Sequence, residues 1–318
     1  MQQGRRGNGW SMLAAVMLAA CEGDIGPTGP AGPAGPTGPT GTPGAPGSPG
    51  APGSGFAGRT LYAIDGSNTL LTFGALTPGT RLSQVTVTGL SAGEQLVGID
   101  FRPADDQLYG VSTASRLYTI NTTTGAATAV GGGSITPTVV GTTFGVGFNP
   151  MADRLRIHTS ADQNLRVNQT ANPLVTFNDA TLAYAAGDVN AGQDPRIAGT
   201  AYTLSVRPAP TATELFAIDA GRDALVRLNA PNDGMITTVG ALGFDTSDDV
   251  GFDIAGDTDF AYASLTPAGA ATGPSRLYTV NLRSGSVTAV GQIGHPTPLR
   301  SIAVAPGAPP SPNKLPAR

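Results

Sequence analysis

One short loop has the residue types and the spacing of a metal site. Residues 188–194 read Asp-Val-Asn-Ala-Gly-Gln-Asp, so that Asp188, Asn190 and Asp194 supply oxygen atoms around a glycine. Such spacing is typical of calcium loops, but the bidentate acid that completes an EF-hand loop is missing. A turn held by hydrogen bonds from the Asp and Asn side chains explains the same pattern. We favour that turn and expect no cofactor, with calcium as the alternative.

Three further oxygen side chains recur at or near the ends of short apolar segments, namely Asp100, Asn149 and Asp253. Some propeller-shaped hydrolases and lactonases hold a central metal with carboxylates, which makes these three residues candidates for axial ligands. The repetition of the segments themselves explains their positions better. The sequence has no His-Glu-x-x-His motif and no Gly-x-x-x-x-Gly-Lys phosphate loop. We therefore expect no catalytic activity and keep a metal-dependent hydrolase or lactonase as the alternative.

Other titratable residues have simpler interpretations. The only two histidines, His158 and His295, lie far apart in the sequence, which argues against a His-rich zinc centre. A second acidic group is interpreted as a solvated loop in which some carboxylates cap strand ends. It comprises Asp245, Asp248, Asp249 and Asp253.

The composition excludes several classes of protein. Cys21 is the only cysteine, which rules out an intrachain disulfide and a cysteine-based metal site. The formal net charge is −4, and there is no basic stripe that would bind nucleic acid. Charged residues make up 13% of a chain with 45 Gly and 27 Pro, a composition that suits short strands and tight turns.

The N-terminal residues resemble a bacterial lipoprotein signal peptide. Two arginines precede the apolar run 10–20, which is too short to span a bilayer as a mature helix. The run ends in Leu-Ala-Ala-Cys, so we predict a signal peptide over residues 1–20 and lipidation of Cys21. Because Glu22 follows rather than Asp, the resemblance implies the outer membrane or the cell surface. A plain secretory signal with an incidental cysteine is the alternative.

A collagen-like stretch follows the cysteine. From Gly23 to Gly53, glycine recurs at every third position among many prolines. Only glycine fits at the axis of three packed polyproline chains, which is why this period is typical of collagen. We expect residues 21–58 to form a stiff spacer that holds the globular part away from the membrane. A trimerising stalk, and with it a homotrimer, is the alternative.

The body of the chain, residues 59–305, contains a long internal repeat. SRLYTINTTTGAATAVG, from Ser115 to Gly131, returns as SRLYTVNLRSGSVTAVG, from Ser275 to Gly291. Two copies of this length indicate a repeated structural unit. A unit that cannot bury its own apolar face must stack on its neighbours.

Groups of short strands recur along this body at the spacing of propeller blades. First strands are expected at 97–101, 145–149, 199–206, 250–254 and 299–305. The last of these has no strand after it, whereas strands expected at 60–65, 69–73 and 84–88 have no first strand before them. Joining the two ends completes a blade and removes free sheet edges. The predicted fold is an all-β, five-bladed β-propeller with four strands per blade, closed by its N- and C-terminal strands; six blades or a β-sandwich are the alternatives.

Several segments are similar to those of a known family. GIDFRPADDQLYG at 98–110, GFNPMADRLRI at 147–157 and LAYAAGDVNAGQDPRIAGTAYT at 182–203 resemble a bacterial family of exported, propeller-like domains of unknown function. The resemblance covers nearly all of Leu61 to Val304 and implies the fold without implying an activity.

Together these features predict a lipid-anchored cell-surface protein that serves binding or scaffolding. We expect a propeller over residues 59–305, displayed on a Gly-Pro spacer and followed by a disordered Pro-rich tail at 306–318. The expected partners are the membrane, through the lipidated N-terminus, and an unknown protein or glycan bound by loops at one mouth of the propeller. Nucleic acid is not expected as a partner.

Overall fold

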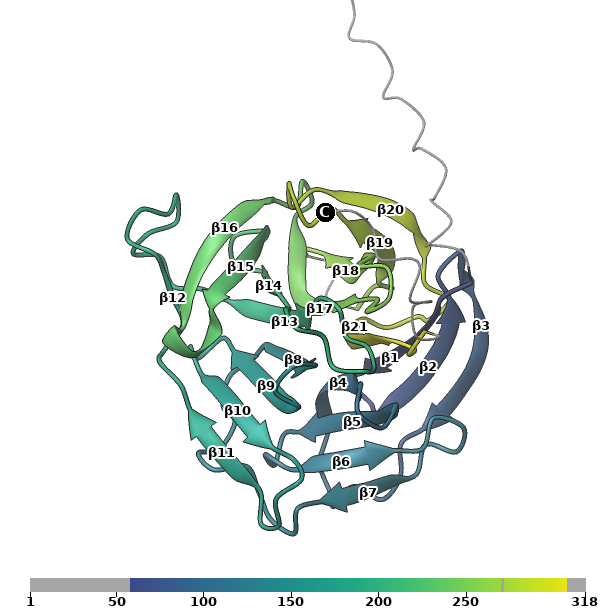
Figure 1. Cartoon of the computed structure of the whole chain (residues 1–318). Coiled ribbons are helices and arrows are strands. Elements are labelled where there is room, and N and C mark those ends of the chain that lie inside the picture. Colours follow the sequence, from purple (N-terminus) through teal and green to yellow (C-terminus); the bar gives the residue numbers. More distant parts are fainter. Residues whose placement is uncertain (1–57, 270–271, 308–318) are drawn as a thin grey trace, which may run out of the picture. The chain divides into compact units, whose positions relative to one another are not determined.

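The computed structural model describes residues 58–269 and 272–307, and these residues form a ring of five antiparallel sheets (Figure 1). Helix is confined there to one 3-10 turn, η1 (Pro231–Asp233). The predicted five-bladed β-propeller is thereby confirmed. The predicted signal peptide, Cys21, the Gly-X-Y stretch and most of the tail lie outside the described residues. No helix within the described ranges is both long and apolar enough to cross a bilayer.

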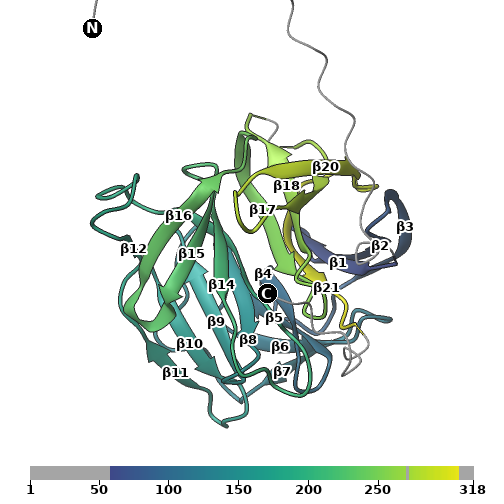
Figure 2. The same cartoon turned by 45° about the horizontal axis from the view of Figure 1, so that its top comes forward.

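Each blade is a sheet whose innermost strand lies near the ring axis, as Figures 1 and 2 show from two directions. Blade 1 is β21 (Leu299–Val304), β1 (Thr60–Asp65), β2 (Thr69–Gly74) and β3 (Thr77–Thr86). Blade 2 is β4 (Leu96–Arg102), β5 (Gln107–Ser112), β6 (Leu117–Ile120) and β7 (Ala127–Val130). Blade 3 is β8 (Phe144–Asn149), β9 (Arg154–Thr159), β10 (Asn164–Asn168) and β11 (Val175–Asn178). Blade 4 is β13 (Ile197–Tyr202), β14 (Leu215–Asp219), β15 (Ala224–Ala230), β16 (Met235–Ala241) and the short β12 (Ala183–Tyr184). Blade 5 is β17 (Thr246–Ile254), β18 (Ala261–Pro267), β19 (Arg276–Val280) and β20 (Val287–Gln292).

The ring closes in blade 1, where strands from both ends of the described chain pair. β21 runs antiparallel to β1, with Tyr62 opposite Ala303 and Ala63 opposite Ile302. This is the closure predicted from the incomplete strand sets at the two ends. β21 thus supplies the inner strand that blade 1 would otherwise lack. The ring then has no incomplete blade with an exposed sheet edge at its axis.

The inner strands approach one another so closely that several positions require glycine. A Cβ atom on Gly251 of β17 would lie 2.6 Å from the backbone N of Ile302 in β21. A Cβ atom on Gly199 of β13 would lie 2.6 Å from the Cβ of Phe252. Real Cβ atoms do not come this close to other heavy atoms. The glycines that recur in the predicted first strands therefore let five strands converge on a narrow axis.

The serine that begins each copy of the internal repeat holds the connection to the next blade. The Oγ of Ser115 accepts a hydrogen bond from the backbone N of Val139 at 2.8 Å. The Oγ of Ser275 accepts one from the backbone N of Leu299 at 2.9 Å. Both serines are almost completely buried, at 2% and 1% exposure. The first half of the repeat thus fixes the loop that leads into the following inner strand.

The glycine in the second half of the repeat contacts the preceding blade. Gly125 has a positive φ of 75°, and its carbonyl oxygen accepts from the backbone N of Thr88 at 3.0 Å. Gly285 has a φ of 79°, and a Cβ atom there would lie 2.3 Å from the carbonyl oxygen of Gly240. The two copies match in sequence because each hairpin binds blades on both sides of its own.

The apolar core lies mainly between neighbouring blades. Tyr62 of blade 1 and Phe101 of blade 2 meet edge to face with ring centroids 5.3 Å apart. Tyr109 of blade 2 and Phe148 of blade 3 do the same at 5.1 Å. Such contacts bury one face of each sheet against the next, so that a single blade has no core of its own.

Three strand predictions differ from the structure. The fourth strand of blade 1, expected at 84–88, is β3 (Thr77–Thr86), because irregular pairing near Phe73 accommodates a Pro-Gly pair that resembles a turn signal. The first strand of blade 4, expected at 199–206, ends at Tyr202, and Leu204 has a φ of 53° that an extended strand does not allow. Blade 4 also gains β12, which pairs in parallel with β16 and was not predicted.

Candidate functional site

The five inner strands begin at one end of the ring axis and finish at the other. We call these ends the N-terminal mouth and the C-terminal mouth. Each mouth has a cavity that is lined by residues of several inner strands. The two cavities differ in size and in chemistry, and they are described in turn.

The C-terminal mouth holds two of the three predicted axial residues. Asp100 of β4 and Asp253 of β17 line one cavity of about 20 Å³. Ser205, from the loop after β13, and Gly307, after β21, line its outer part. A cavity of this volume admits about one water molecule. It has no room for an organic substrate beside the two carboxyl groups.

Both carboxyl groups tie neighbouring inner strands together. The Oδ2 of Asp100 accepts a hydrogen bond from the backbone N of Phe148 in β8 at 2.6 Å. The Oδ2 of Asp253 accepts one from the backbone N of Val304 in β21, also at 2.6 Å. Inner strands do not pair with each other as a sheet, so these N–H groups would otherwise be buried without an acceptor. The two aspartates therefore have a clear structural role.

Burial raises the pKa of both carboxyl groups. It raises the pKa of Asp253 to about 7. Burial also raises the pKa of Asp100 well above its ordinary value, and the nearby charge of Asp253 raises that pKa further. Two buried carboxyl groups that line the same small cavity do not both ionise near neutral pH. The pair therefore retains a proton there.

The third predicted axial residue, Asn149, is not one of the residues that line this cavity. Its Oδ1 accepts hydrogen bonds from the backbone N of Met151 at 2.9 Å and of Ala152 at 3.0 Å. It therefore caps the turn between β8 and β9. The sequence placed all three residues near the ends of inner strands, but only Asp100 and Asp253 come together.

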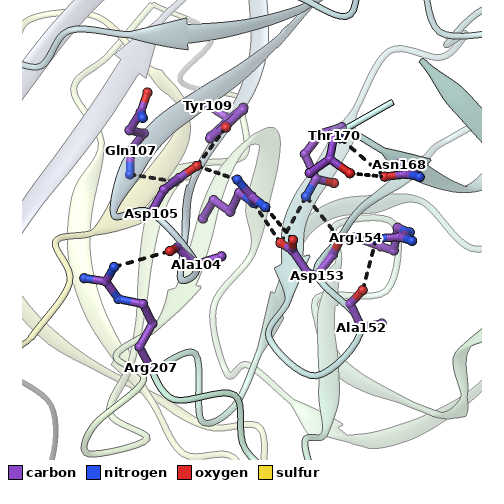
Figure 3. Close-up of polar contacts among 12 residues, drawn as sticks. Ala104, Asp105, Gln107, Tyr109, Ala152, Asp153, Arg154, Asn168, Thr170 and Arg207 are labelled. Atoms are coloured by element: carbon purple, nitrogen blue, oxygen red, sulfur yellow. Dashed lines mark hydrogen bonds and ion pairs between the residues drawn. The ribbon is translucent and has the colours of Figure 1, made fainter. Parts of the chain in front are cut away.

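A second charged group joins blades 2 and 3 (Figure 3). The guanidinium of Arg102 donates from Nε to the Oδ1 of Asp153 at 2.8 Å and from Nη1 to the Oδ2 of Asp105 at 2.5 Å. The hydroxyl of Tyr109 donates to the same Asp105 oxygen at 3.0 Å. Hydrogen bonds from Arg102 hold the pKa of the Asp153 carboxyl below its usual value. The guanidinium and both carboxylates are paired with one another, so we interpret the group as a clamp that holds blades 2 and 3 together.

The predicted calcium loop is folded as a turn on blade 4. The Oδ1 of Asp188 accepts from the backbone N of Asn190 at 2.9 Å, and its Oδ2 accepts from the backbone N of Thr238 at 2.6 Å. The amide of Asn190 donates to the hydroxyl of Thr238 at 3.0 Å. Asp194 lies beside another carboxyl group, that of Asp162; burial and the charge of Asp194 together raise the Asp162 pKa to about 6. These contacts are those of a side-chain-stabilised turn, and calcium binding stays a prediction.

Both histidines are buried and have polar partners. In His158, Nδ1 lies 2.9 Å from the Oγ1 of Thr200 and Nε2 lies 3.1 Å from the Oδ1 of Asn164. Burial lowers the pKa of His158 to about 3, so the ring is neutral. In His295, Nε2 lies 3.0 Å from the Oδ2 of Asp65. Across the described ranges, no group of three His, Cys, Asp or Glu side chains could hold a metal ion.

The N-terminal mouth has a larger cavity, of about 240 Å³, which receives residues from all five blades. β21 supplies Arg300, and the beginning of β17 supplies Asp248 and Asp249. Gln95, just before β4, and Thr142, just before β8, add polar groups, and Ala198 of β13 completes the set. This cavity therefore combines both signs of charge with neutral hydrogen-bonding groups.

The charges at this mouth are only partly neutralised. Asp248 forms an ion pair with Arg196, whose Nη1 lies 3.0 Å from its Oδ1. The Nη1 of Arg300 donates instead to the Oε1 of Gln95 at 3.0 Å. Burial raises the pKa of Asp249, although the charge of Arg300 acts in the opposite direction. A partly buried carboxyl group and a guanidinium thus share the cavity without an ion pair between them.

The cavity at the N-terminal mouth was not predicted from the sequence, for two reasons. Arg300 lies in a short apolar strand that gives no signal of its own. Asp248, Asp249 and Asp253 were interpreted as one solvated acidic loop, but they belong to β17, which passes along the axis. β17 places Asp249 at the N-terminal mouth and Asp253 at the C-terminal mouth.

The family of the chain follows from its match to a family model. A model described as a domain of unknown function, DUF4394, matches residues 69–303, which cover nearly the whole ring. The chain belongs to this family. A search of the curated proteins finds no match. Membership of DUF4394 therefore agrees with the expected propeller-like domain and brings no activity with it.

Solved structures similar to this DUF4394 domain have low sequence identity. A nidogen/laminin complex aligns at 14% identity over 78% of this chain and 98% of that chain, with a TM-score of 0.44. A structural genomics protein of unknown function from Bacteroides thetaiotaomicron aligns at 14% identity over 79% and 68%, with a TM-score of 0.47. The dihydro-heme d1 dehydrogenase NirN in complex with DHE aligns at 12% identity over 74% and 44%, with a TM-score of 0.35. At these TM-scores none of the three indicates a ligand for the DUF4394 domain.

Proposed function

We propose that this chain is a cell-surface binding protein that takes a small polar ligand at the N-terminal mouth of its propeller. The observation that supports the proposal is the cavity of about 240 Å³ that all five blades line. Binding sites commonly lie where rigid elements bring a few polar groups together in a concave surface. The C-terminal mouth is less suitable, because its cavity of about 20 Å³ has room for about one water molecule only.

The size of the cavity favours a glycan unit over a folded protein as the ligand. A protein partner needs an interface of about 800 Å² on each side, whereas a single sugar residue fits a small concave site. Hydroxyl and amide groups such as those of Thr142 and Gln95 are suited to sugar hydroxyls. A scaffolding role without a small ligand would use the outer faces of the blades instead.

An array of bacterial and host glycans tests the ligand proposal directly. The full chain should bind a subset of the glycans, and Thr142→Trp should abolish that binding because the indole fills the exposed rim of the cavity. Thr86→Trp is the matched control, since Thr86 is exposed on the outermost strand of blade 1 and away from the axis. Binding that survives Thr142→Trp would place the ligand elsewhere.

The proposal also includes export and a lipid anchor at Cys21, followed by the Gly-X-Y spacer at 23–53. Its support is the sequence pattern, because these residues lie outside the described ones. Radiolabelled fatty acid should label the wild-type chain and not Cys21→Ala. Labelling of both chains would remove the anchor from the proposal. Sedimentation with and without residues 23–53 tests the homotrimer, and equal monomer mass in both would exclude it.

A metal-dependent hydrolase or lactonase is the second candidate. Its one support is the buried pair of Asp100 and Asp253, because two close carboxyl groups with raised pKa values are common in catalytic sites. The cavity beside the pair admits about one water molecule, which counts against an organic substrate there. Metal analysis of the purified chain, combined with melting in calcium or EDTA, separates this candidate from a simple binding protein. The same measurement tests calcium at Asp188, Asn190 and Asp194. A melting temperature that neither addition changes, with no metal bound, removes both.

A further inference from the structure

The cavity at the N-terminal mouth presents two opposite charges that do not form an ion pair with each other. Arg300 makes a hydrogen bond to Gln95, and no ion pair of Arg300 occurs among the described residues. Asp249 likewise has no ion-pair partner within the described ranges, since the nearby Arg196 is paired with Asp248. Both residues line the same cavity. Their charges are therefore available to a ligand.

The fold holds each of these side chains in place. The guanidinium of Arg300 lies over Gly66, where a Cβ atom would be only 3.1 Å from Nη2. Gln95 fixes its other side through the bond to Nη1. Asp249 lies in β17, an inner strand whose next residue, Val250, is fully buried, so the backbone that carries the carboxylate is held in place. A ligand would thus meet a fixed guanidinium and a carboxylate on a fixed backbone, which reduces the entropy lost on binding.

We propose that this cavity binds a small zwitterion, whose carboxylate contacts Arg300 and whose ammonium group contacts Asp249. The inference rests on the proposed binding function of this mouth, and it replaces the glycan unit by a charged ligand of similar size. A neutral ligand would leave two partly desolvated charges without a partner, and a simple anion or cation would leave one. A zwitterion satisfies both, and unpaired charges discriminate strongly against ligands that lack the matching group. The cavity of about 240 Å³ is suited to a molecule of amino-acid size.

Titration calorimetry on the full chain tests the proposal with defined probes. The probes are the L-amino acids as zwitterions, propionate as a carboxylate, ethylammonium as a cation and glucose as a neutral sugar. We expect at least one amino acid to bind more tightly than the other three. Asp249→Asn and Arg300→Met should each weaken the binding of that amino acid by about tenfold to a hundredfold. This is the usual range for the loss of one charge-assisted hydrogen bond. Arg207→Met is the matched control, because Arg207 is exposed near Asp106, towards the C-terminal mouth.

Three outcomes would overturn the proposal. They are no binding by any amino acid, propionate binding as tightly as the best amino acid, and amino-acid binding that Asp249→Asn leaves unchanged. If glucose or an array glycan binds and Thr142→Trp removes that binding, the proposed binding function stands and only the zwitterion fails. Circular dichroism and melting establish that each variant is folded. If Arg300→Met does not fold, Arg300→Lys replaces it, because a lysine keeps the charge and loses the paired geometry.

Discussion

A close approach between two inner strands gives a sharp test of the ring. Gly251 lies in β17 against the backbone of β21, the strand that closes the propeller. In Gly251→Ala the new methyl carbon would lie 2.6 Å from the N of Ile302 and 2.8 Å from the carbonyl carbon of Ser301. Neither atom can move aside as a flexible side chain would. One of the two strands must therefore shift away from the axis.

The expected cost follows from overpacking a dense core. Inserting a methyl group where the backbone is the obstacle destabilises a protein by about 1–3 kcal/mol. The reduced flexibility of the unfolded chain returns about 0.4–1 kcal/mol when alanine replaces glycine. For a domain of this size 1 kcal/mol corresponds to about 2–4 °C in melting temperature. The net cost is then at most about 2.6 kcal/mol, so we expect Gly251→Ala to melt below the wild type by up to roughly 10 °C.

A matched alanine variant separates this effect from any general consequence of replacing glycine. Gly187 is exposed, its φ is in the ordinary range, and a Cβ atom there would meet nothing within 4 Å. Gly187→Ala should melt at or slightly above the wild-type temperature. Differential scanning calorimetry of the three proteins provides the comparison. Equal melting temperatures for the two variants would show that β17 and β21 are not packed as described.

Three other predictions concern the carboxyl pair, the blade clamp and the repeated serine. Because the folded-state pKa of Asp253 is about 7 and the unfolded value 3.8, the folded state binds more protons between these pH values. The free energy of unfolding should therefore fall as pH rises from 4 to 7; urea titrations that show a rise across this range would contradict it. Arg102→Met should lower the free energy of unfolding in urea by about 1–3 kcal/mol, because it leaves two partly buried carboxylates unpaired. Arg154→Met is the control: it removes hydrogen bonds to carbonyl oxygens only and should lower the free energy of unfolding by less than about 1 kcal/mol. Ser115→Ala and Ser275→Ala should each lower stability by about 1–3 kcal/mol and by similar amounts, and a large difference in calorimetry would mean that the two copies do not play the same part.

Much of the architecture could be predicted because it depends on neighbouring segments. Alternating apolar residues and turn residues identify strands that pair with the next strand along the chain. The pairing of the segment around Tyr62 with the segment around Ile302 could also be predicted, because each end of the body lacks the strands that the other supplies. β12 could not, since Ala183 pairs with Met235 and neither residue carries a signal for a distant parallel partner.

The candidate site was harder to predict for a related reason. Arg300 and Asp249 share a cavity only because ring closure brings β21 beside β17. Nothing near either residue in the sequence indicates that contact. The direction of β17 also matters, because it separates acidic residues that are adjacent in the sequence into two different environments. Asp100 and Asp253 were predicted as axial candidates together with Asn149, yet their bonds to backbone N–H groups become visible only when neighbouring strands are in place.

The pairing of β1 with β21 has a consequence for how the chain is made. Ribosomes synthesise β1 early and β21 last among the described strands, so a nascent chain exposes the edge of β1 throughout elongation. Blade 1 cannot assemble until β21 has left the ribosome, and the other blades lack a closed ring to pack into until then. Premature folding is therefore disfavoured while translation continues.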